Sequence, residues 1–159
     1  MKGSLLMLTF RKAKMSDVET MHELINLYAQ KGLMLARSRN SFYEGLREFT
    51  VADYDGQVVG AGGLHLLWSD LAEIRALAIH PDYAGQGIGR KLVETLVNEA
   101  KEMELPRVFA LTYQPEFFSK CGFTEVAMDV LPHKVWRECI NCPKFPKCDE
   151  RAFVLDLND

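Results

Sequence analysis

The sequence lacks the features of membrane-spanning, secreted and nucleic-acid-binding proteins. No apolar run approaches the roughly 20 residues that a bilayer-spanning helix needs, and the apolar start MKGSLLMLTF is followed by RKAKMSD with no small-residue cleavage site. The 19 Lys and Arg residues are outnumbered by 22 Asp and Glu, and the net charge of −3 gives no reason to expect binding to nucleic acid or to an acidic membrane. We therefore expect a cytoplasmic protein whose cysteines stay reduced and whose apolar start is a strand.

Internal repeats and inter-domain linkers are also absent from the sequence. The 159 residues, 48% of them hydrophobic, predict a single domain over residues 1–159 with one sizeable core. Hydrophobic periodicity predicts strands at 5–11, 49–54, 57–67, 71–79, 108–112, 123–128 and 152–157. It predicts helices that begin near 16, 41, 88 and 115. The hairpin signal Asp55-Gly56 favours a mixed sheet in an α/β or α+β fold.

The first predicted helix carries a start signal and a stop signal. Ser16-Asp17-Val18-Glu19 fits a capping box, in which the Ser16 oxygen and the Glu19 side chain each satisfy a backbone amide. Gly32 fits the glycine that commonly follows the end of a helix. We therefore expect a helix that starts at Ser16 and stops before Gly32.

Three glycines stand where a predicted strand changes into a predicted helix, in HPDYAGQGIGRKL. Gly85, Gly87 and Gly89 allow a ligand to approach the backbone closely, and the first amides of the following helix point outward without intrahelical partners. With the helix dipole they predict a phosphate or pyrophosphate site, to which Arg90 and Lys91 add positive charge. The loop is not a Walker motif, because that motif needs Gly-Lys followed by Ser or Thr. It also differs from the dinucleotide-binding fingerprint, because its spacing is G-x-G-x-G.

The segment AEIRALAIHPDYAGQGIGRKL resembles the acetyl-CoA-binding segment of the GCN5-related N-acetyltransferase (GNAT) superfamily, although Ala84 stands where Arg or Gln is usual. PEFFSKCGF resembles a second motif of that superfamily, with Phe118 in place of the usual Tyr. The resemblance implies a GNAT fold, a mixed central sheet flanked by helices, with a V-shaped splay between its two central strands. It also implies acetyl-CoA as cosubstrate, bound at Leu77, Ala78, Ile79, Ala84, Gly85, Gln86, Gly87, Ile88, Gly89, Arg90 and Phe118.

A narrower resemblance runs through nearly the whole chain. FRKAKMSDVETMHELI, KGLMLARSRNSFYE, FFSKCGFTEVAMDVLPHK and VLDLND resemble the acetyltransferase domain of N-acetylglutamate synthase. The amino-acid-kinase domain of many members is absent, so we expect a stand-alone short form. The resemblance implies acetyl transfer to L-glutamate, the first step of arginine biosynthesis. Alternatives are acetylation of another small amine or amino acid, and a non-catalytic CoA-binding sensor. The sequence does not fix the oligomeric state; homodimers are common in the superfamily, and that analogy is the one indication of a dimer.

An acidic acceptor calls for guanidinium groups, because these bind a carboxylate through two parallel hydrogen bonds. By the resemblance, Arg37 corresponds to the substrate-binding Arg of the family, Leu35 supplies backbone contacts, and Arg39 is a further candidate. Any one such Arg taken alone is more simply interpreted as a solvated surface charge, but the paired RSR at the matching position favours Arg37. The family has another carboxylate-binding Arg in its C-terminal segment, where this sequence departs in length and composition. The candidates there are Lys134, Arg137 and Arg151.

Acetyl transfer to an amine needs a group that accepts a proton from the incoming ammonium. Glu73 lies on the strand before the glycine loop, where the superfamily commonly keeps a base, and we expect it to act through water. The competing interpretation is a carboxylate that only pairs with Arg75. Alternation along the strand predicts Glu73, Arg75 and Leu77 on one face.

The tetrahedral intermediate and the departing thiolate need further groups. By the resemblance, a backbone amide near 77–79 stabilises the oxyanion. A thiol with a pKa of about 8.5 leaves as a thiolate that can require a proton, which Phe118 cannot supply. Tyr113 and Thr112 are the candidates for this acid, although a buried Tyr113 would be ordinary packing. Cys121 has no His-based activation pattern and is expected to pack in the core.

Cys139, Cys142 and Cys148 form a C-x2-C-x5-C pattern with His133 upstream. Three thiolates and one imidazole can hold zinc tetrahedrally, and such an ion would be structural. Only one C-x2-C is present, so a redox pair and a proline-rich loop with reduced cysteines are alternatives.

Overall fold

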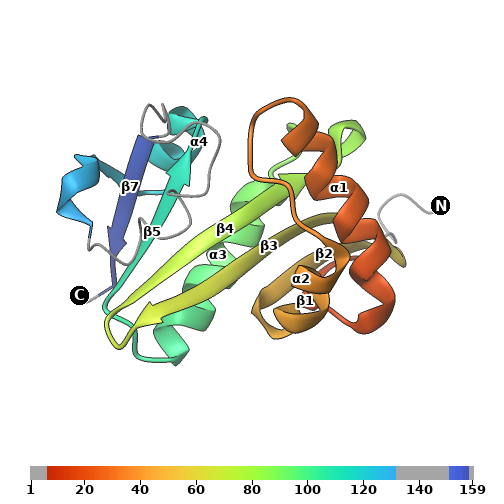
Figure 1. Ribbon diagram of the computed structural model, residues 1–159, viewed down its shortest axis with the longest axis horizontal. Coiled ribbons are helices and arrows are strands. Elements are labelled where there is room, and N and C mark those ends of the chain that lie inside the picture. The colour runs from red at the N-terminus through yellow and green to blue at the C-terminus, as the bar shows by residue number, and fades with distance from the viewer. Residues whose placement is uncertain (1–6, 132–150, 158–159) are drawn as a thin grey trace.

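Residues 7–131 and 151–157, which the computed structural model describes, form a seven-stranded mixed sheet with helices on both faces (Figure 1). The strand order is β1-β2-β3-β4-β5-β7-β6, and every ladder is antiparallel except β4–β5. The strands are β1 (Leu8–Lys12), β2 (Phe49–Tyr54), β3 (Gln57–Trp68), β4 (Leu71–Ile79), β5 (Arg107–Thr112), β6 (Thr124–Val126) and β7 (Arg151–Asp156). The helices are α1 (Val18–Gln30), α2 (Arg39–Glu44), α3 (Ile88–Glu102) and α4 (Pro115–Lys120). The expected mixed sheet flanked by helices is confirmed.

Two helix layers cover opposite faces of the sheet with separate apolar cores (Figure 1). On one face α3 buries an apolar stripe that includes Leu96 and Val97 against β3 and β4. On the other face α1 and α2 bury Met21, Ile25 and Phe42. Each large apolar side chain that is fully buried contributes about 1.5–3 kcal/mol, so burial holds both layers on the sheet. Within the described chain, none of the helices has the length and apolar character that crossing a membrane requires.

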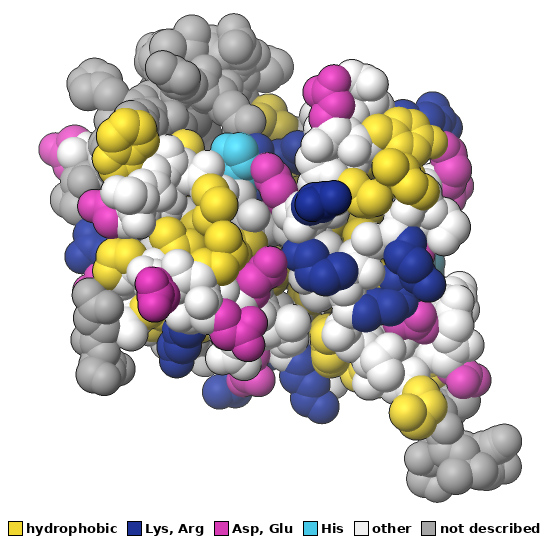
Figure 2. All heavy atoms as spheres, turned by 90° about the horizontal axis from the view of Figure 1, so that it is seen from below, with side chains coloured by type: hydrophobic (Ala, Val, Ile, Leu, Met, Phe, Trp, Pro, Cys, Tyr) yellow, Lys and Arg dark blue, Asp and Glu magenta, His cyan; other side chains and the backbone are white. Residues whose placement is uncertain are grey.

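The molecular surface carries charges of both signs. The face drawn in Figure 2 shows Lys and Arg side chains beside Asp and Glu, with hydrophobic side chains in several groups between them. This mixture agrees with the small net charge of −3.

A β-bulge interrupts β4 at Ala76. The β3–β4 ladder shifts register between Ala61 and Gly63, so that two residues of β4 oppose the single residue Gly62. Ala76 has a φ of 54°, in the left-handed region that a residue with a side chain rarely adopts. A Cβ on Gly62 would lie 2.8 Å from the Leu77 side chain. A side chain at position 62 would therefore have to displace Leu77, and glycine avoids this contact.

The bulge overturns one expectation about the faces of β4. Strict alternation predicts Leu77 on the same face as Glu73 and Arg75. Leu77 instead packs with Ile74 against the core beneath α3, while Ala76 packs on the α1 side. The prediction is wrong for Leu77, because the extra residue of a bulge reverses the alternation beyond it.

The strands β4 and β5 are paired only at their starts. Their parallel ladder joins Ala72 to Val108 and Glu73 to Phe109, and these are its pairs among the described residues. Both strands continue past this point and diverge (Figure 1). The expected V-shaped splay between the central strands is confirmed.

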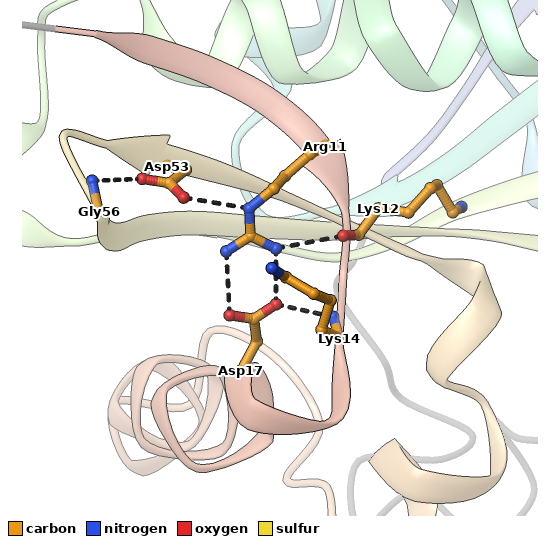
Figure 3. Close-up of polar contacts among 6 residues, drawn as sticks. All are labelled: Arg11, Lys12, Lys14, Asp17, Asp53 and Gly56. Atoms are coloured by element: carbon orange, nitrogen blue, oxygen red, sulfur yellow. Dashed lines mark hydrogen bonds and ion pairs between the residues drawn. The ribbon is translucent and has the colours of Figure 1, made fainter.

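An ion-paired cluster fixes the start of α1 against β1 and the β2–β3 hairpin (Figure 3). The Arg11 guanidinium donates to the Asp17 carboxylate at 2.8 and 3.1 Å, and to Asp53 at 3.0 Å. Asp17 also accepts the Lys14 N–H at 2.7 Å, and Asp53 accepts the Gly56 N–H at 2.7 Å. The hydrogen bond from Arg11 holds the pKa of Asp17 below its ordinary value. One guanidinium thus joins three elements.

The expected capping box at Ser16 is wrong. A 3₁₀ turn, Met15–Asp17, precedes α1, and the carboxylate of Asp17 accepts the N–H of the residue before that turn. Asp17 is the residue immediately before α1, but its carboxylate bonds to Arg11 and to the Lys14 N–H and makes no hydrogen bond to an amide of the helix. The stop signal is confirmed, because Gly32 follows α1 with a φ of 75°.

Two predicted elements differ in extent from those observed. The helix expected near 41–48 is divided at Gly45 into α2 and the 3₁₀ turn Leu46–Glu48. The strand expected at 123–128 is shorter, because the 3₁₀ turn Met128–Val130 follows β6.

Replacing Asp17 by Asn should lower the free energy of unfolding at neutral pH by about 1.5–3 kcal/mol, because the Arg11 guanidinium loses its charge-assisted bonds to Asp17 and keeps one carboxylate partner, Asp53. The lowered pKa means that Asp17 stabilises the fold above the ordinary carboxyl pKa of 3.8, and that this contribution disappears as the pH falls through the lower folded-state pKa. Urea unfolding at pH about 7 and about 3 should therefore show a smaller decline with acid for Asp17→Asn than for the wild type. Asp70→Asn, in the exposed β3–β4 turn, is the control. An equal effect of the two substitutions would contradict the role of Asp17.

Ala76→Gly should raise the free energy of unfolding by about 0.5–1 kcal/mol, because glycine adopts the φ of 54° without strain. Ala78→Gly is the matched control, since Ala78 is buried in the same strand and core but lies outside the left-handed region. It should lower stability by about 1 kcal/mol through lost packing and added chain entropy. Chemical denaturation measures the change in the free energy of unfolding of both variants, which should be positive for Ala76→Gly and negative for Ala78→Gly. A loss of stability in both would argue against strain at the bulge.

Candidate functional site

A cavity of about 600 Å³ opens where β4 and β5 diverge. Its lining comes from residues 73–79 of β4, the end of β5, the start of α3, helix α4 and the segment between α1 and α2. The predicted site residues in this lining are Leu35, Arg37, Glu73, Leu77, Ala78, Ile79, Ala84, Gly85, Gly87, Ile88, Gly89, Arg90, Thr112, Tyr113 and Phe118. Of the predicted residues in the described part of the chain, Gln86, Arg39 and Arg151 are not part of it.

The wall at the start of α3 presents backbone instead of side chains. Gly85 and Gly87 have φ of 80° and 82°, which glycine adopts without strain, and a Cβ on either would meet no atom within 4 Å. The Lys91 N–H donates to the Gly87 carbonyl at 3.2 Å, so the amides of 88–90 precede the regular hydrogen bonds of the helix. The exposed Arg90 side chain adds a positive charge. This end of α3 suits an anion such as a phosphate.

An aromatic wall comes from α4. Phe118 is buried and makes edge-to-face contacts with Phe117 and Phe123, with ring centroids 5.1 and 5.2 Å apart. It therefore belongs to the core as well as to the cavity. Cys121 packs against the same core, and burial raises the pKa of its thiol. A raised pKa disfavours the thiolate, which agrees with the expected packing role.

Two hydroxyl groups lie at the end of β5. Thr112 is buried, and its hydroxyl oxygen accepts the Gln114 N–H at 2.8 Å in the turn that leads to α4. Tyr113 follows it and lines the cavity while remaining half-buried. Both candidate acids are therefore present at the cavity, and Thr112 also holds the adjoining turn.

Glu73 and Arg75 form an ion pair on the wall that β4 contributes. Arg75 Nη2 donates to Glu73 Oε1 at 3.0 Å, and the two side chains are only 9% and 14% exposed. Both residues line the cavity. The two interpretations of Glu73, a carboxylate at the site and a partner of Arg75, are thus compatible.

A second acid–base pair lies on the same face of the sheet. His65 is opposite Glu73 in the β3–β4 ladder, and its Nδ1 lies 2.8 Å from Glu48 Oε2. Burial acts to raise the pKa of Glu48, but the His65 hydrogen bond and the charges of Arg75 and Arg37 outweigh it, and the pKa lies below its ordinary value. These side chains therefore form one electrostatically coupled cluster.

The two arginines of the RSR motif have different surroundings. Arg37 lines the cavity, its Nη1 donates to Ser41 Oγ at 3.1 Å, and its guanidinium carbon lies 6.0 Å from the centre of the Phe49 ring. Arg39 instead donates to both carboxylate oxygens of Glu19, at 3.0 and 2.8 Å, on the exposed side of α1 and α2. The structure therefore favours Arg37 over Arg39 as a residue that meets a ligand.

The sequence-based prediction missed Tyr28 as a residue of the cavity. Its spacing places it in the apolar stripe of α1, but its hydroxyl donates to the Ile79 carbonyl at 2.5 Å and the residue lines the cavity. Burial raises the pKa of Tyr28, which preserves the phenol as a donor. The sequence feature that could have identified it is the hydroxyl group of Tyr28, a polar group in an otherwise apolar stripe.

Several predicted residues lie outside the described residues. These are His133, Lys134, Arg137, Cys139, Cys142 and Cys148. Arg151 is described at the start of β7, where it pairs with Glu125 of β6 at 2.6 Å. Within residues 7–131 and 151–157, no group of three His, Cys, Asp or Glu side chains could hold a metal ion.

Comparison with known proteins relates this cavity to a family. Residues 18–123 match the acetyltransferase (GNAT) family. The chain is 40% identical over 147 residues to an uncharacterized N-acetyltransferase of Chlorobaculum tepidum, covering 92% of this chain and 95% of that protein. It is 44% identical over 119 residues to an amino-acid acetyltransferase of Mycobacterium tuberculosis, covering 73% and 68%. The N-acetylglutamate synthase of Neisseria gonorrhoeae, solved with coenzyme A and N-acetyl-glutamate, is similar with a TM-score of 0.87 and 25% identity, over 96% of this chain and 36% of that one.

Proposed function

This chain belongs to the acetyltransferase (GNAT) family, and on that premise we propose that it transfers the acetyl group of acetyl-CoA to the α-amine of L-glutamate, the first step toward arginine. One observation carries the choice of acceptor: Arg37, Glu73 and the start of α3 line the same cavity. A cation for a carboxylate, a base for an ammonium and an anion site for a pyrophosphate are the three groups that this reaction needs.

The start of α3 supports binding of the acetyl-CoA pyrophosphate. The bare backbone at Gly85 and Gly87 leaves room for a ligand, and the amides of 88–90 and the Arg90 side chain favour negative charge. The related synthase of Neisseria gonorrhoeae was solved with coenzyme A. Because Ala84 offers no polar side chain, the backbone amides supply most of the binding.

The surroundings of Arg37 support a dicarboxylate acceptor. Neighbours from α2 and β2 hold the guanidinium in one orientation, which suits bidentate binding of a carboxylate. In this proposal Arg37 binds one carboxylate of glutamate, Leu35 contributes its backbone, and Lys134 or Arg137 binds the other carboxylate. The names of two relatives support an amino-acid acceptor, since one is an amino-acid acetyltransferase and the other was solved with N-acetyl-glutamate.

In the proposed mechanism Glu73 accepts a proton from the glutamate ammonium through a water molecule, and the neutral amine attacks the thioester carbon. The C–N bond forms first, a backbone amide of 77–79 stabilises the oxyanion, and the C–S bond then breaks. Tyr113 or Thr112 donates a proton to the departing thiolate and is reprotonated as the amide nitrogen releases its second proton, so that the net proton released is the one taken up through Glu73. Arg75 donates to the Glu73 carboxylate and so orients it at the wall of the cavity.

Incubation with acetyl-CoA and a panel of amino acids and amines should give the highest kcat/KM for L-glutamate, measured as release of thiol. Glutamine tests the need for the side-chain charge, and aspartate tests its distance from the amine. A preference for another acceptor would contradict the glutamate assignment and indicate a GNAT enzyme for a different amine. Binding of acetyl-CoA without turnover of any acceptor would indicate a sensor, the alternative favoured by Phe118, which lacks the hydroxyl of the family motif.

Arg37→Ala should raise the KM for glutamate about 10–100-fold and leave the KM for acetyl-CoA within about twofold, because a charge-assisted hydrogen bond contributes about 1.5–3 kcal/mol. Arg39→Ala is the matched control, since Arg39 belongs to the same motif but pairs with Glu19 away from the cavity. It should change neither KM appreciably. Equal effects of Arg37→Ala on the two KM values would contradict its assignment to the acceptor.

A further inference from the structure

We propose that Asn26 is a positioning residue that fixes Arg37 for acceptor binding, an inference that rests on the proposed function. Asn26 lies in the interior of α1, and Arg37 lies eleven residues later in the connection to α2. Asn26 does not line the cavity, so it reaches the acceptor only through Arg37.

The Asn26 side chain contacts both polar groups of the Arg37 main chain. The Arg37 N–H donates to Asn26 Oδ1 at 3.1 Å, and Asn26 Nδ2 donates to the Arg37 carbonyl at 3.0 Å. Nδ2 also donates to the His22 carbonyl at 2.8 Å. These three bonds fix the orientation of the amide, because exchanging its oxygen and nitrogen would place like groups face to face at all three. The Asn26 side-chain amide thus makes the same two hydrogen bonds to the Arg37 main chain that a residue of a neighbouring β-strand would make.

The main chain of Arg37 depends on such a partner. Residues 35–38 belong to no helix or strand, so no ladder supplies hydrogen bonds to their backbone. Ser38 begins α2, where its side-chain oxygen accepts the Ser41 N–H at 3.1 Å. Arg37 is therefore held between the clamp from α1 on one side and the start of α2 on the other.

Backbone and guanidinium are fixed by different neighbours. Asn26 holds the main chain, while Ser41 and the Phe49 ring contact the guanidinium. Without Asn26 the charge of Arg37 is unchanged, but the segment that carries it can move relative to the cavity. Since a bidentate contact with a carboxylate requires close alignment, the loss falls on acceptor binding, and the start of α3 is unaffected.

The test compares Asn26→Ala and Asn26→Asp with the wild type, using the acceptor that the wild type turns over fastest. Ala removes both bonds to Arg37, and Asp places an oxygen against the Arg37 and His22 carbonyls. Both variants should raise the KM for the acceptor about tenfold, as expected for two hydrogen bonds, with kcat and the KM for acetyl-CoA within about twofold. Asn40→Ala is the control, because it removes an exposed amide that donates to Glu44 at 3.2 Å, outside the lining of the cavity, and it should leave all three constants unchanged.

A double-mutant cycle separates positioning from general loss of structure. If Asn26 acts through Arg37, then Asn26→Ala in the Arg37→Ala background should raise the acceptor KM no further. Full additivity, or an equal rise in both KM values, would overturn the proposal. An unchanged acceptor KM in Asn26→Ala, with a raised one in Arg37→Ala, would overturn it while leaving the proposed function intact. An unchanged acceptor KM in Arg37→Ala would instead refute the acceptor site itself and this inference with it.

Discussion

The divergence of β4 from β5 is the constraint on which the site depends. Two ladder pairs join the strands at their starts, and beyond them the two backbones separate. The outer edges of both strands remain paired, with β3 and β7, so the opening is confined to the middle of the sheet. A continuous ladder would have filled this space with cross-strand contacts. Because it is interrupted, backbone groups and side chains from both sides of the sheet can meet one ligand.

The bulge at Ala76 determines what β4 presents on each side of this opening. Before the bulge, Glu73 and Arg75 lie on the face that α1 and α2 cover; after it, Leu77 packs beneath α3. The polar groups that we assign to the acceptor thus gather on one face, with Arg37 and the Glu48–His65 pair. On the other face α3 begins at a glycine-rich turn that suits a phosphate.

Much of this fold was predictable from strong local sequence patterns. The bounds of β2 and β4, the helix after the glycines and the mixed sheet follow from periodicity and turn residues. The failures share a cause, which is that a partner distant in sequence decides the outcome. Asp17 instead of Ser16 directly precedes α1, and its carboxylate bonds to Arg11 of β1. Leu77 changes face because of pairing with β3, which no pattern within β4 encodes.

The candidate site was predictable where a motif implies backbone geometry and less so where side chains are chosen by their neighbours. The glycine loop lines the cavity almost as expected. By contrast, two arginines of one short motif differ in their surroundings, because Arg39 pairs with Glu19 on α1 while Arg37 lines the cavity. Tyr28 was not predicted because helical spacing assigns a residue to one face of the helix but does not predict a hydrogen bond from its hydroxyl to β4.

The separate cores on the two faces of the sheet have an evolutionary consequence. Substitutions that do not touch one another alter stability almost independently, and the sheet keeps most of the α1–α2 layer apart from the α3 layer. A descendant of this chain can therefore change the α1–α2 layer, to which we assign the acceptor, while the packing of the α3 layer stays intact. Such a partition allows one ancestral scaffold to acquire new acceptors by substitutions in one helix layer, while the packing of the other layer is retained.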